Sequence, residues 1–135
     1  MTRTAPPLTE RTAEYWQSGR DGVLRIARCG GCGTYTHPPL PVCPHCHADA
    51  MAFTPVIGRG RVHAFTVNRY PWDPALPPPY VLAEIDLEEQ PRLRVLSTVV
   101  DCAPEDVRVG MPVTVAFERA GDAWIPVFRP NAARP

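Results

Sequence analysis

Four cysteines carry the clearest chemical signal in this sequence. They form two Cys-x-x-Cys pairs with ten residues between them, at Cys29, Cys32, Cys43 and Cys46. Thiolate sulfur is a preferred ligand of Zn²⁺, and four such donors enclose the ion in a tetrahedron. Because a closed shell leaves no position for water or substrate, the spacing predicts a structural zinc ion and argues against zinc catalysis.

Three histidines lie close enough in sequence to be alternative ligands. His45 and His47 stand beside the second pair, where either could replace a thiolate, and His37 lies in the loop between the pairs. Four cysteines at matching spacing already satisfy the ion, so we expect sulfur ligands only. A redox role would require a thioredoxin-like alternation of strands and helices, which the sequence does not have.

No other group of residues forms a recognisable active site. The fifth cysteine, Cys102, has the acidic neighbours Asp101, Glu105 and Asp106, which raise the pKa of a thiol and do not activate it. His63 lies within a predicted strand, where half-exposed packing is expected. The sequence also lacks a nucleophile elbow, a P-loop and a dinucleotide-binding glycine motif. We therefore expect a chain that contains no active site of its own.

The segments around the cysteines predict a short helix followed by a zinc ribbon. Residues 9–19, TERTAEYWQSG, have Thr9 as a helix cap and Gly19 as a stop signal. A helix this short must pack against something, either its own chain or a neighbouring subunit. Strand-like segments, GVLRIARC and HADAMAF, then flank the two cysteine pairs, which is the layout of a zinc ribbon.

Five strand-like segments follow the ribbon, and they predict an OB-type barrel. They are RVHAFTV, YVLAEIDL, LRVLSTVV, VTVAFER and AWIPVF, with a one-turn helix in CAPEDVRVGMP after the third. Alternation in the first places Val62, Ala64 and Thr66 on one face. An incomplete sandwich is the alternative architecture. The predicted organisation is an arm and helix (1–20), a zinc ribbon (21–54), an OB-fold (55–130) and a tail (131–135).

Composition limits the partners and the compartment. The 135 residues include 14 arginines, no lysine and 14 acidic residues, so the formal charge is zero and nothing attracts nucleic acid or anionic membranes generally. The apolar runs are far shorter than the roughly 20 residues that span a bilayer. Since the N-terminus lacks the apolar section of a secretory signal, we expect a soluble protein in the reducing cytoplasm.

The ordered combination of these segments resembles a known family. The segments LRIARCGGCGTYTHPPLPVCPHC, GRGRVHAFTV, PPYVLAEIDL and PEDVRVGMPVTVAF resemble acyl-CoA-associated proteins that join an N-terminal helix and rubredoxin-like zinc ribbon to a C-terminal OB-fold. The resemblance extends from about Thr9 to Phe128. It implies a small partner of thiolase-like enzymes, including lipid-transfer-protein-like aldolases, or of MaoC-type acyl-CoA hydratases. It also implies that the four paired cysteines bind the zinc ion.

The resemblance implies that the large partner performs the chemistry on an acyl-CoA held at a shared site. We therefore expect a non-catalytic accessory subunit for retro-aldol cleavage or thiolysis, in steroid side-chain or aromatic catabolism. Aromatic side chains are enriched at interface anchors. The aromatic residues expected at the partner interface are Tyr15, Trp16, Tyr70, Trp72 and Tyr80.

Direct contact with CoA is a further expectation. Arg59, Arg61 and Arg69 flank the first barrel strand and could meet the CoA phosphates, although a solvated strand edge explains them equally well. The competing function is a single-stranded nucleic-acid-binding module, because zinc ribbons and OB-folds both occur in such proteins. That function favours a basic groove lined with aromatic residues. Zero net charge and mostly aliphatic strands make nucleic acid the weaker hypothesis.

Overall fold

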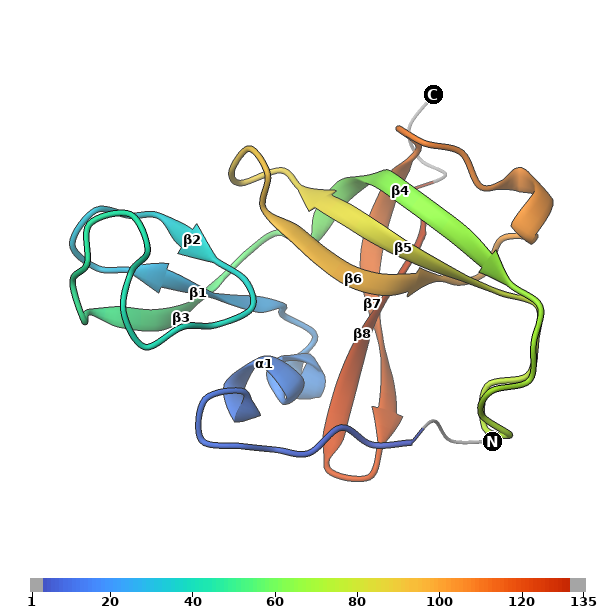
Figure 1. Cartoon of the computed structure of the whole chain (residues 1–135), viewed down its shortest axis with the longest axis horizontal. Coiled ribbons are helices and arrows are strands. Elements are labelled where there is room, and N and C mark those ends of the chain that lie inside the picture. The colour runs from blue at the N-terminus through green and yellow to red at the C-terminus, as the bar shows by residue number, and fades with distance from the viewer. Residues whose placement is uncertain (1–3, 132–135) are drawn as a thin grey trace.

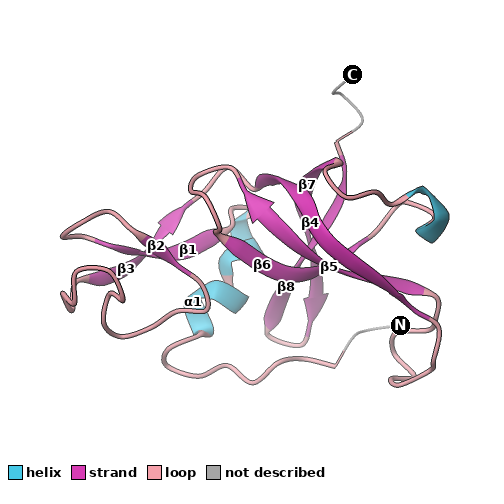
Figure 2. Cartoon of the chain, turned by 45° about the horizontal axis from the view of Figure 1, so that its top comes forward, coloured by secondary structure: helices cyan, strands magenta, loops and turns pink. Residues whose placement is uncertain are grey.

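The computed structural model describes residues 4–131, so the predicted tail lies outside the described residues except for Asn131. Two β units lie side by side, and the N-terminal helix sits next to both (Figures 1 and 2). The smaller unit contains the paired cysteines and the larger one is a five-stranded barrel. The predicted fold class, mainly β with a short helix, a zinc ribbon and an OB-type barrel, is confirmed.

The ribbon is a three-stranded antiparallel sheet in the order β2-β1-β3. The strands are β1 (Arg25–Cys29), β2 (Tyr35–Thr36) and β3 (Met51–Pro55). The two longer strands correspond to the segments predicted on either side of the cysteines, whereas the two-residue β2 was not predicted. Because β1 ends at Cys29, the first cysteine pair begins where the central strand stops.

The barrel closes in the order β4-β5-β6-β8-β7, so the sandwich alternative is wrong. The five strands are β4 (Arg59–Asn68), β5 (Tyr80–Leu87), β6 (Arg94–Val99), β7 (Pro112–Ala120) and β8 (Ala123–Pro130). A short 3₁₀ helix, η2 (Pro104–Asp106), connects the third and fourth of them. Strand β6 runs parallel to β8, with the register pair Val99 and Phe128, and all other neighbours in the barrel are antiparallel.

Aliphatic side chains fill the barrel. Strand β5 shows the simplest pattern, because Val81, Ala83, Ile85 and Leu87 are buried while the residues between them are at least partly exposed. Each fully buried aliphatic side chain stabilises the fold by roughly 1.5–3 kcal/mol relative to an exposed one. The side chain of Phe128 from β8 is also completely buried in this core.

The face predicted for β4 is wrong beyond its first residues. Val62 is buried as expected, but Ala64 and Thr66 are exposed, and Phe65 and Val67 pack against the core instead. The pairing of β4 with β5 shifts between Val62 and Ala64. Such a β-bulge inserts one residue into one strand, so every side chain after it changes to the opposite face.

The N-terminal helix is shorter than predicted. The structure has α1 (Ala13–Trp16) followed by the 3₁₀ helix η1 (Ser18–Asp21). Thr9 does start the turn, because its hydroxyl accepts a hydrogen bond from the Thr12 amide (3.2 Å) and its carbonyl accepts one from the Ala13 amide (2.8 Å). In residues 4–131, no helix has the length and apolar character needed to cross a bilayer.

Gly19 does not end the helix but allows it to approach the barrel. A Cβ atom at Gly19 would collide with the ring of Phe117 on β7. The stop is Gly22, whose φ of +79° lies in the left-handed region that glycine adopts without strain. The helical segment therefore packs on its own chain, which decides between the two packing alternatives left open by the sequence.

The turn between β5 and β6 connects the ribbon to the barrel. The Gln90 side chain accepts a hydrogen bond from the Tyr35 amide (2.8 Å) and donates one to the Tyr35 carbonyl (3.0 Å). Beside it, the Glu89 carboxylate accepts a hydrogen bond from the amide of Ile57 (2.8 Å), in the segment that joins β3 to β4. One turn of the barrel thus holds both a ribbon strand and the linker.

Candidate metal centre and neighbouring surfaces

The structure brings the sulfur atoms of the four paired cysteines together. All four Sγ atoms lie within 4.8 Å of one another, and the pairs Cys29–Cys46 and Cys32–Cys43 are each 3.6 Å apart. Zinc with Zn–S bonds of about 2.3 Å would set tetrahedral S–S separations at about 3.8 Å. A disulfide needs about 2.05 Å. The separations fit four thiolates around one zinc ion.

Both cysteine pairs are built to the same local pattern. In the first, the amides of Gly31 (3.3 Å) and Cys32 (3.5 Å) donate hydrogen bonds to the Cys29 sulfur. In the second, the corresponding amides, of His45 (3.3 Å) and Cys46 (3.5 Å), donate to the Cys43 sulfur. Backbone N–H groups aimed at sulfur stabilise the thiolate form that binds metal.

The residue after each pair completes the pattern. Gly33 and His47 occupy equivalent positions, and both have positive φ, +81° and +68°. Their amides each donate a 2.9 Å hydrogen bond to the carbonyl of the first cysteine of the pair, Cys29 or Cys43. A positive φ is uncommon for a non-glycine residue, and histidine is among those that tolerate it. His47 is therefore a turn residue in the structure.

Hydrogen bonds and neighbouring sulfur atoms shift the pKa values of three thiols in the cluster. Hydrogen bonding from the Cys32 amide holds the pKa of Cys29 below its usual value, and hydrogen bonding with Thr34 lowers the pKa of Cys32 to about 6. The Ala48 amide lowers the pKa of Cys46, but the neighbouring sulfurs outweigh it and raise that pKa to about 11. Four thiolates this close repel one another, so the donor set fits a cation at its centre.

The histidines take no part in the sulfur cluster. Within residues 4–131, the potential metal ligands that gather at this site are the four cysteines, while His45 and His47 are exposed. His37 packs against Tyr15 of the N-terminal helix, with 4.7 Å between the ring centroids. Burial lowers the pKa of His37 to about 4, so its ring is uncharged at neutral pH.

The two halves of the chain match two family models. Residues 16–52 match the ChsH2 rubredoxin-like zinc ribbon domain, and residues 54–118 match the ChsH2 C-terminal OB-fold domain. A chain of the solved structure described as "Ltp2-ChsH2(DUF35) aldolase" is 34% identical, with a TM-score of 0.85 over 93% of this chain and 98% of that one. This chain belongs to the ChsH2/DUF35 family. The family resemblance inferred from the sequence is confirmed.

Two curated relatives show different contexts for the ChsH2/DUF35 module. A probable enoyl-CoA hydratase alpha subunit of Thermomonospora curvata is 35% identical over 95% of this chain, which spans only 40% of that protein. A DUF35 domain-containing scaffold protein of Methanocaldococcus jannaschii is 38% identical over 68% of this chain and 65% of its own length. The chain thus spans less than two thirds of both relatives.

The aromatic residues expected at an interface differ in exposure in this DUF35 chain. Tyr15 is only 5% exposed, because it packs between Trp16, which is half-buried, and His37. Tyr80 is half-buried at the start of β5. Tyr70 and Trp72 are 59% and 72% exposed. The aromatic surface open to a partner is therefore mainly the Tyr70–Trp72 pair.

The Tyr70–Trp72 pair is held in place by its own loop. Its two ring centroids are 4.4 Å apart. The Trp72 indole donates a hydrogen bond to the Asn68 side-chain oxygen (3.0 Å), and the Asn68 amide group donates to the Tyr70 carbonyl (2.7 Å). Five prolines between residues 71 and 79 stiffen the same loop. A rigid exposed aromatic pair loses little conformational entropy when a partner covers it.

The three arginines expected at CoA do not converge. Arg59 lies 3.8 Å from the Glu88 carboxylate, and Arg61 donates a hydrogen bond to the Gly110 carbonyl (2.8 Å). Arg69 follows the other end of β4, whose ten residues span about 30 Å at about 3.3 Å per residue. A single nucleotide phosphate group therefore cannot contact Arg69 together with the other two.

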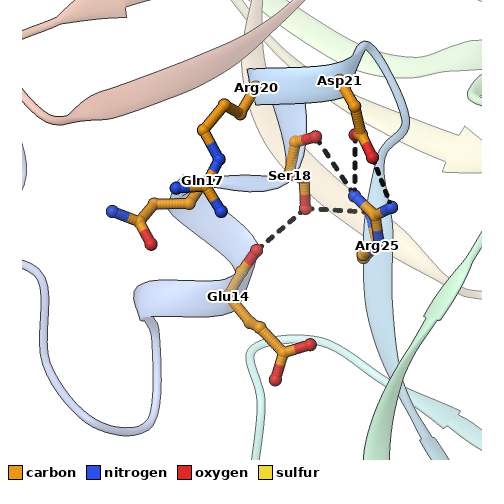
Figure 3. A pocket seen from close by; sticks show the side chains of 6 residues that line it. All are labelled: Glu14, Gln17, Ser18, Arg20, Asp21 and Arg25. Atoms are coloured by element: carbon orange, nitrogen blue, oxygen red, sulfur yellow. Dashed lines mark hydrogen bonds and ion pairs between the residues drawn. The ribbon is translucent and has the colours of Figure 1, made fainter.

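A small polar pocket of about 220 Å³ lies beside the helix (Figure 3). In its lining, the Arg25 guanidinium donates two hydrogen bonds to the Asp21 carboxylate (2.8 and 3.0 Å). It also donates one to the Ser18 carbonyl (3.2 Å). Hydrogen bonding from Arg25 lowers the pKa of Asp21 to about 2. Because Arg25 is committed to these partners, it links η1 to β1 and is not free to bind an anion.

Cys102 and the side chains around Asp86 are two further groups with reactive atoms. Burial first, and then the Asp106 charge, raises the pKa of the Cys102 thiol, which opposes a nucleophilic role. On the barrel surface, Asp86 accepts a hydrogen bond from Arg94 (2.8 Å) and lies 3.3 Å from the His63 ring nitrogen. This cluster is exposed and pairs opposite charges across neighbouring strands.

Sequence reasoning missed two structural features of this DUF35 chain. Gln90, which joins the ribbon to the barrel, lies in the turn EEQPR and has no local motif that reveals its partner. Leu96 is a large aliphatic residue in a barrel strand, yet it is 69% exposed. The sequence does contain a signal for the exposed Leu96, because β6 has apolar residues on both of its alternating faces.

Proposed function

We propose that this chain is a zinc-binding, non-catalytic subunit of an acyl-CoA-processing complex. Its partner would be a thiolase-like or lipid-transfer-protein-like aldolase, and the four cysteines would hold one structural zinc ion. The observation that carries the proposal is the likeness to a chain of the Ltp2-ChsH2(DUF35) aldolase structure, at a TM-score of 0.85 over 98% of that chain. A shared fold alone would not justify it, but the 34% identity adds sequence evidence.

The side chains of the described residues favour a non-catalytic role for this chain. The thiols that could react are gathered in a four-sulfur cluster, and the remaining one, Cys102, has a raised pKa. In the helix pocket Arg25 is paired with Asp21, and on the barrel Asp86 is paired with Arg94 and lies beside His63. In the described part of the chain, no nucleophile is paired with a base in the arrangement that acid–base or covalent catalysis needs.

The partner surface would include Tyr70 and Trp72, with Trp16 as a second contact. We propose that Arg59 and Arg61 approach CoA phosphates from the ribbon end of β4, whereas Arg69 would serve a different contact. The acyl group would derive from steroid side-chain or aromatic degradation, and a MaoC-type hydratase is the alternative partner. Such a complex would work in the cytoplasm, where free thiols remain reduced.

Co-expression tests this function directly. The chain should form a stable complex with the thiolase-fold enzyme encoded beside its gene, as measured by size-exclusion chromatography with light scattering. The isolated chain should turn over no acyl-CoA, while the complex should be more active than the enzyme alone. A lone monomer beside an independently active enzyme would contradict the proposal. Tight, salt-sensitive binding to single-stranded DNA would support the nucleic-acid alternative.

A further inference from the structure

The outer surface of the barrel contains an apolar area that the fold does not use. Two rows of paired residues cross the strands there, Ala64–Glu84–Leu96 and Thr66–Leu82–Thr98. We call the outward residues Ala64, Thr66, Leu82, Glu84 and Leu96 the Leu96 face. On the β6 side of this face, Leu96 is 69% exposed, although a typical strand residue of this type would point inward.

Two hollows border Leu96. The larger, of about 450 Å³, is lined from β6 and β8 by residues that include Ser97 and Ile125, from the helix by Trp16, and from the N-terminal arm by residues 4–7. No charged side chain lines it. The smaller, of about 240 Å³, lies over β4 and β5, with Phe65 and Leu82 in its lining. A projecting side chain between two hollows is a shape that interlocks with a complementary protein surface.

Glu84 is the one charged residue among the five that define the Leu96 face. Along the outer side of β5, Asp86 is paired with Arg94 and His63. Two residues earlier, Glu84 is exposed, and within residues 4–131 its carboxylate has no ion-pair or hydrogen-bond partner. An unpaired carboxylate amid aliphatic side chains is complementary to one cationic side chain in an apolar setting, and it repels phosphates.

The N-terminal arm connects the hollow beside Leu96 to the loop that carries the exposed aromatic pair. The arm that lines the larger hollow reaches the β4–β5 loop, where the Thr4 hydroxyl donates a hydrogen bond to the Asp73 carboxylate (3.1 Å). That loop also carries Tyr70 and Trp72. A partner could therefore cover the face and the aromatic pair together.

We propose that the Leu96 face is a docking surface for a protein partner that presents aliphatic side chains around one arginine or lysine. This inference rests on the proposed function, because the partner meant is the enzyme subunit of the acyl-CoA-processing complex. Leu96 enters a hollow of that partner, and Glu84 pairs with the partner's cation. Two opposite charges attract each other more strongly in an apolar contact than in water, and their positions fix the register of the two surfaces.

Binding measurements with matched variants test the docking surface. The purified wild-type chain, L96E, L96A and E84R are titrated into the co-encoded thiolase-fold enzyme by isothermal calorimetry. V109E and E105R are the controls, because Val109 is 67% exposed and Glu105 is exposed near η2, away from the Leu96 face. L96E and E84R should each weaken Kd at least tenfold, L96A about fivefold, and the controls less than twofold.

Salt dependence separates the charge contact from general loss of binding. The wild-type Kd should rise with ionic strength, and the E84Q variant should show a weaker dependence, because one ion pair is gone. Thermal melting and zinc content should be unchanged in every variant, since all substituted side chains are exposed. If L96E were to misfold, L96A and E84R would still decide the question.

The outcomes distinguish the two proposals. A wild-type chain that forms no complex would overturn the proposed function and this inference with it. A wild-type chain that binds the enzyme while L96E, L96A and E84R bind within twofold of it would overturn only the docking surface. Binding to single-stranded DNA that L96E abolishes would assign the face to a different class of partner, and this too would overturn the inference.

Discussion

The ribbon and the barrel are both small, mainly antiparallel β structures, but they bury very different amounts of apolar side chain. The barrel contributes most of the buried aliphatic cluster, whereas the ribbon sheet adds Ile26 and Tyr35. Most of the residues between β1 and β3 are exposed, and the buried ones are Tyr35, Thr36, Pro39 and Cys43. A structure that buries so little apolar surface cannot offset its loss of chain entropy by packing. We therefore expect the metal ion proposed for the four cysteines to take the place of a core in the ribbon.

The largest expected effect is the loss of the metal. C29S should release zinc and unfold the ribbon, because metal binding supplies about 10–16 kcal/mol in comparable small zinc units. Strands β4 to β8 should remain folded. Zinc analysis together with amide hydrogen exchange resolves the two regions, and C102S is the matched control outside the cluster. Ribbon amides that stay protected without zinc would mean that packing holds this region after all.

The reverse experiment removes part of the barrel core. Ile85 is fully buried on β5, and I85A should lower the free energy of unfolding by about 2–5 kcal/mol, because it leaves a cavity among aliphatic neighbours. The control is L96A, in which the side chain is 69% exposed and the expected change is below about 0.5 kcal/mol. Urea unfolding monitored by fluorescence gives both values. Zinc content should stay at one ion per folded chain.

A smaller effect is expected where the two regions meet. Q90A removes both hydrogen bonds to the Tyr35 backbone, which should cost about 1–2 kcal/mol of local stability. Hydrogen exchange at the Tyr35 amide should accelerate about tenfold or more, while exchange in β5 stays unchanged. Q17A, a half-exposed glutamine on the helix, serves as control. Equal exchange rates in Q90A and the wild type would show that other contacts join the regions.

The smallest effect concerns the Asp21–Arg25 pair. The pKa of Asp21 is lowered to about 2 in the folded chain, below its unfolded value near 4, so the folded state favours the ionised form. Its contribution is present above about pH 4 and disappears as pH falls through about 2. D21N should therefore show a flatter stability profile across that window in chemical unfolding. Identical profiles for D21N and the wild type would contradict the shift.

The sequence revealed those parts of the molecule that depend on local chemistry. The cysteine pairs are local, since their spacing alone brings two sulfurs together, and the β5 alternation is likewise visible in YVLAEIDL. The bulge after Val62 could not be found this way, because a bulge is defined by the partner strand. Gly19 was interpreted as a helix stop, since nothing in its neighbourhood reveals that Phe117 lies against it.

Within the candidate site, the sequence indicated the donors but not their surroundings. The equivalence of Gly33 and His47 became clear only from their backbone angles, so His47 remained an alternative ligand at the level of sequence. The exposed Leu96 illustrates the opposite case. Its strand offers apolar residues on both faces, and only the closed barrel decides which of them remain outside.

The contact between Gly19 and Phe117 has a consequence for how the chain is made. The helical segment leaves the ribosome before strands β7 and β8, yet it packs against the Phe117 ring of β7 and also contacts β8. Both strands must therefore be synthesised before the helical segment can pack. Until then its tyrosine and tryptophan stay in water, where chaperones that recognise aromatic sequences can bind them.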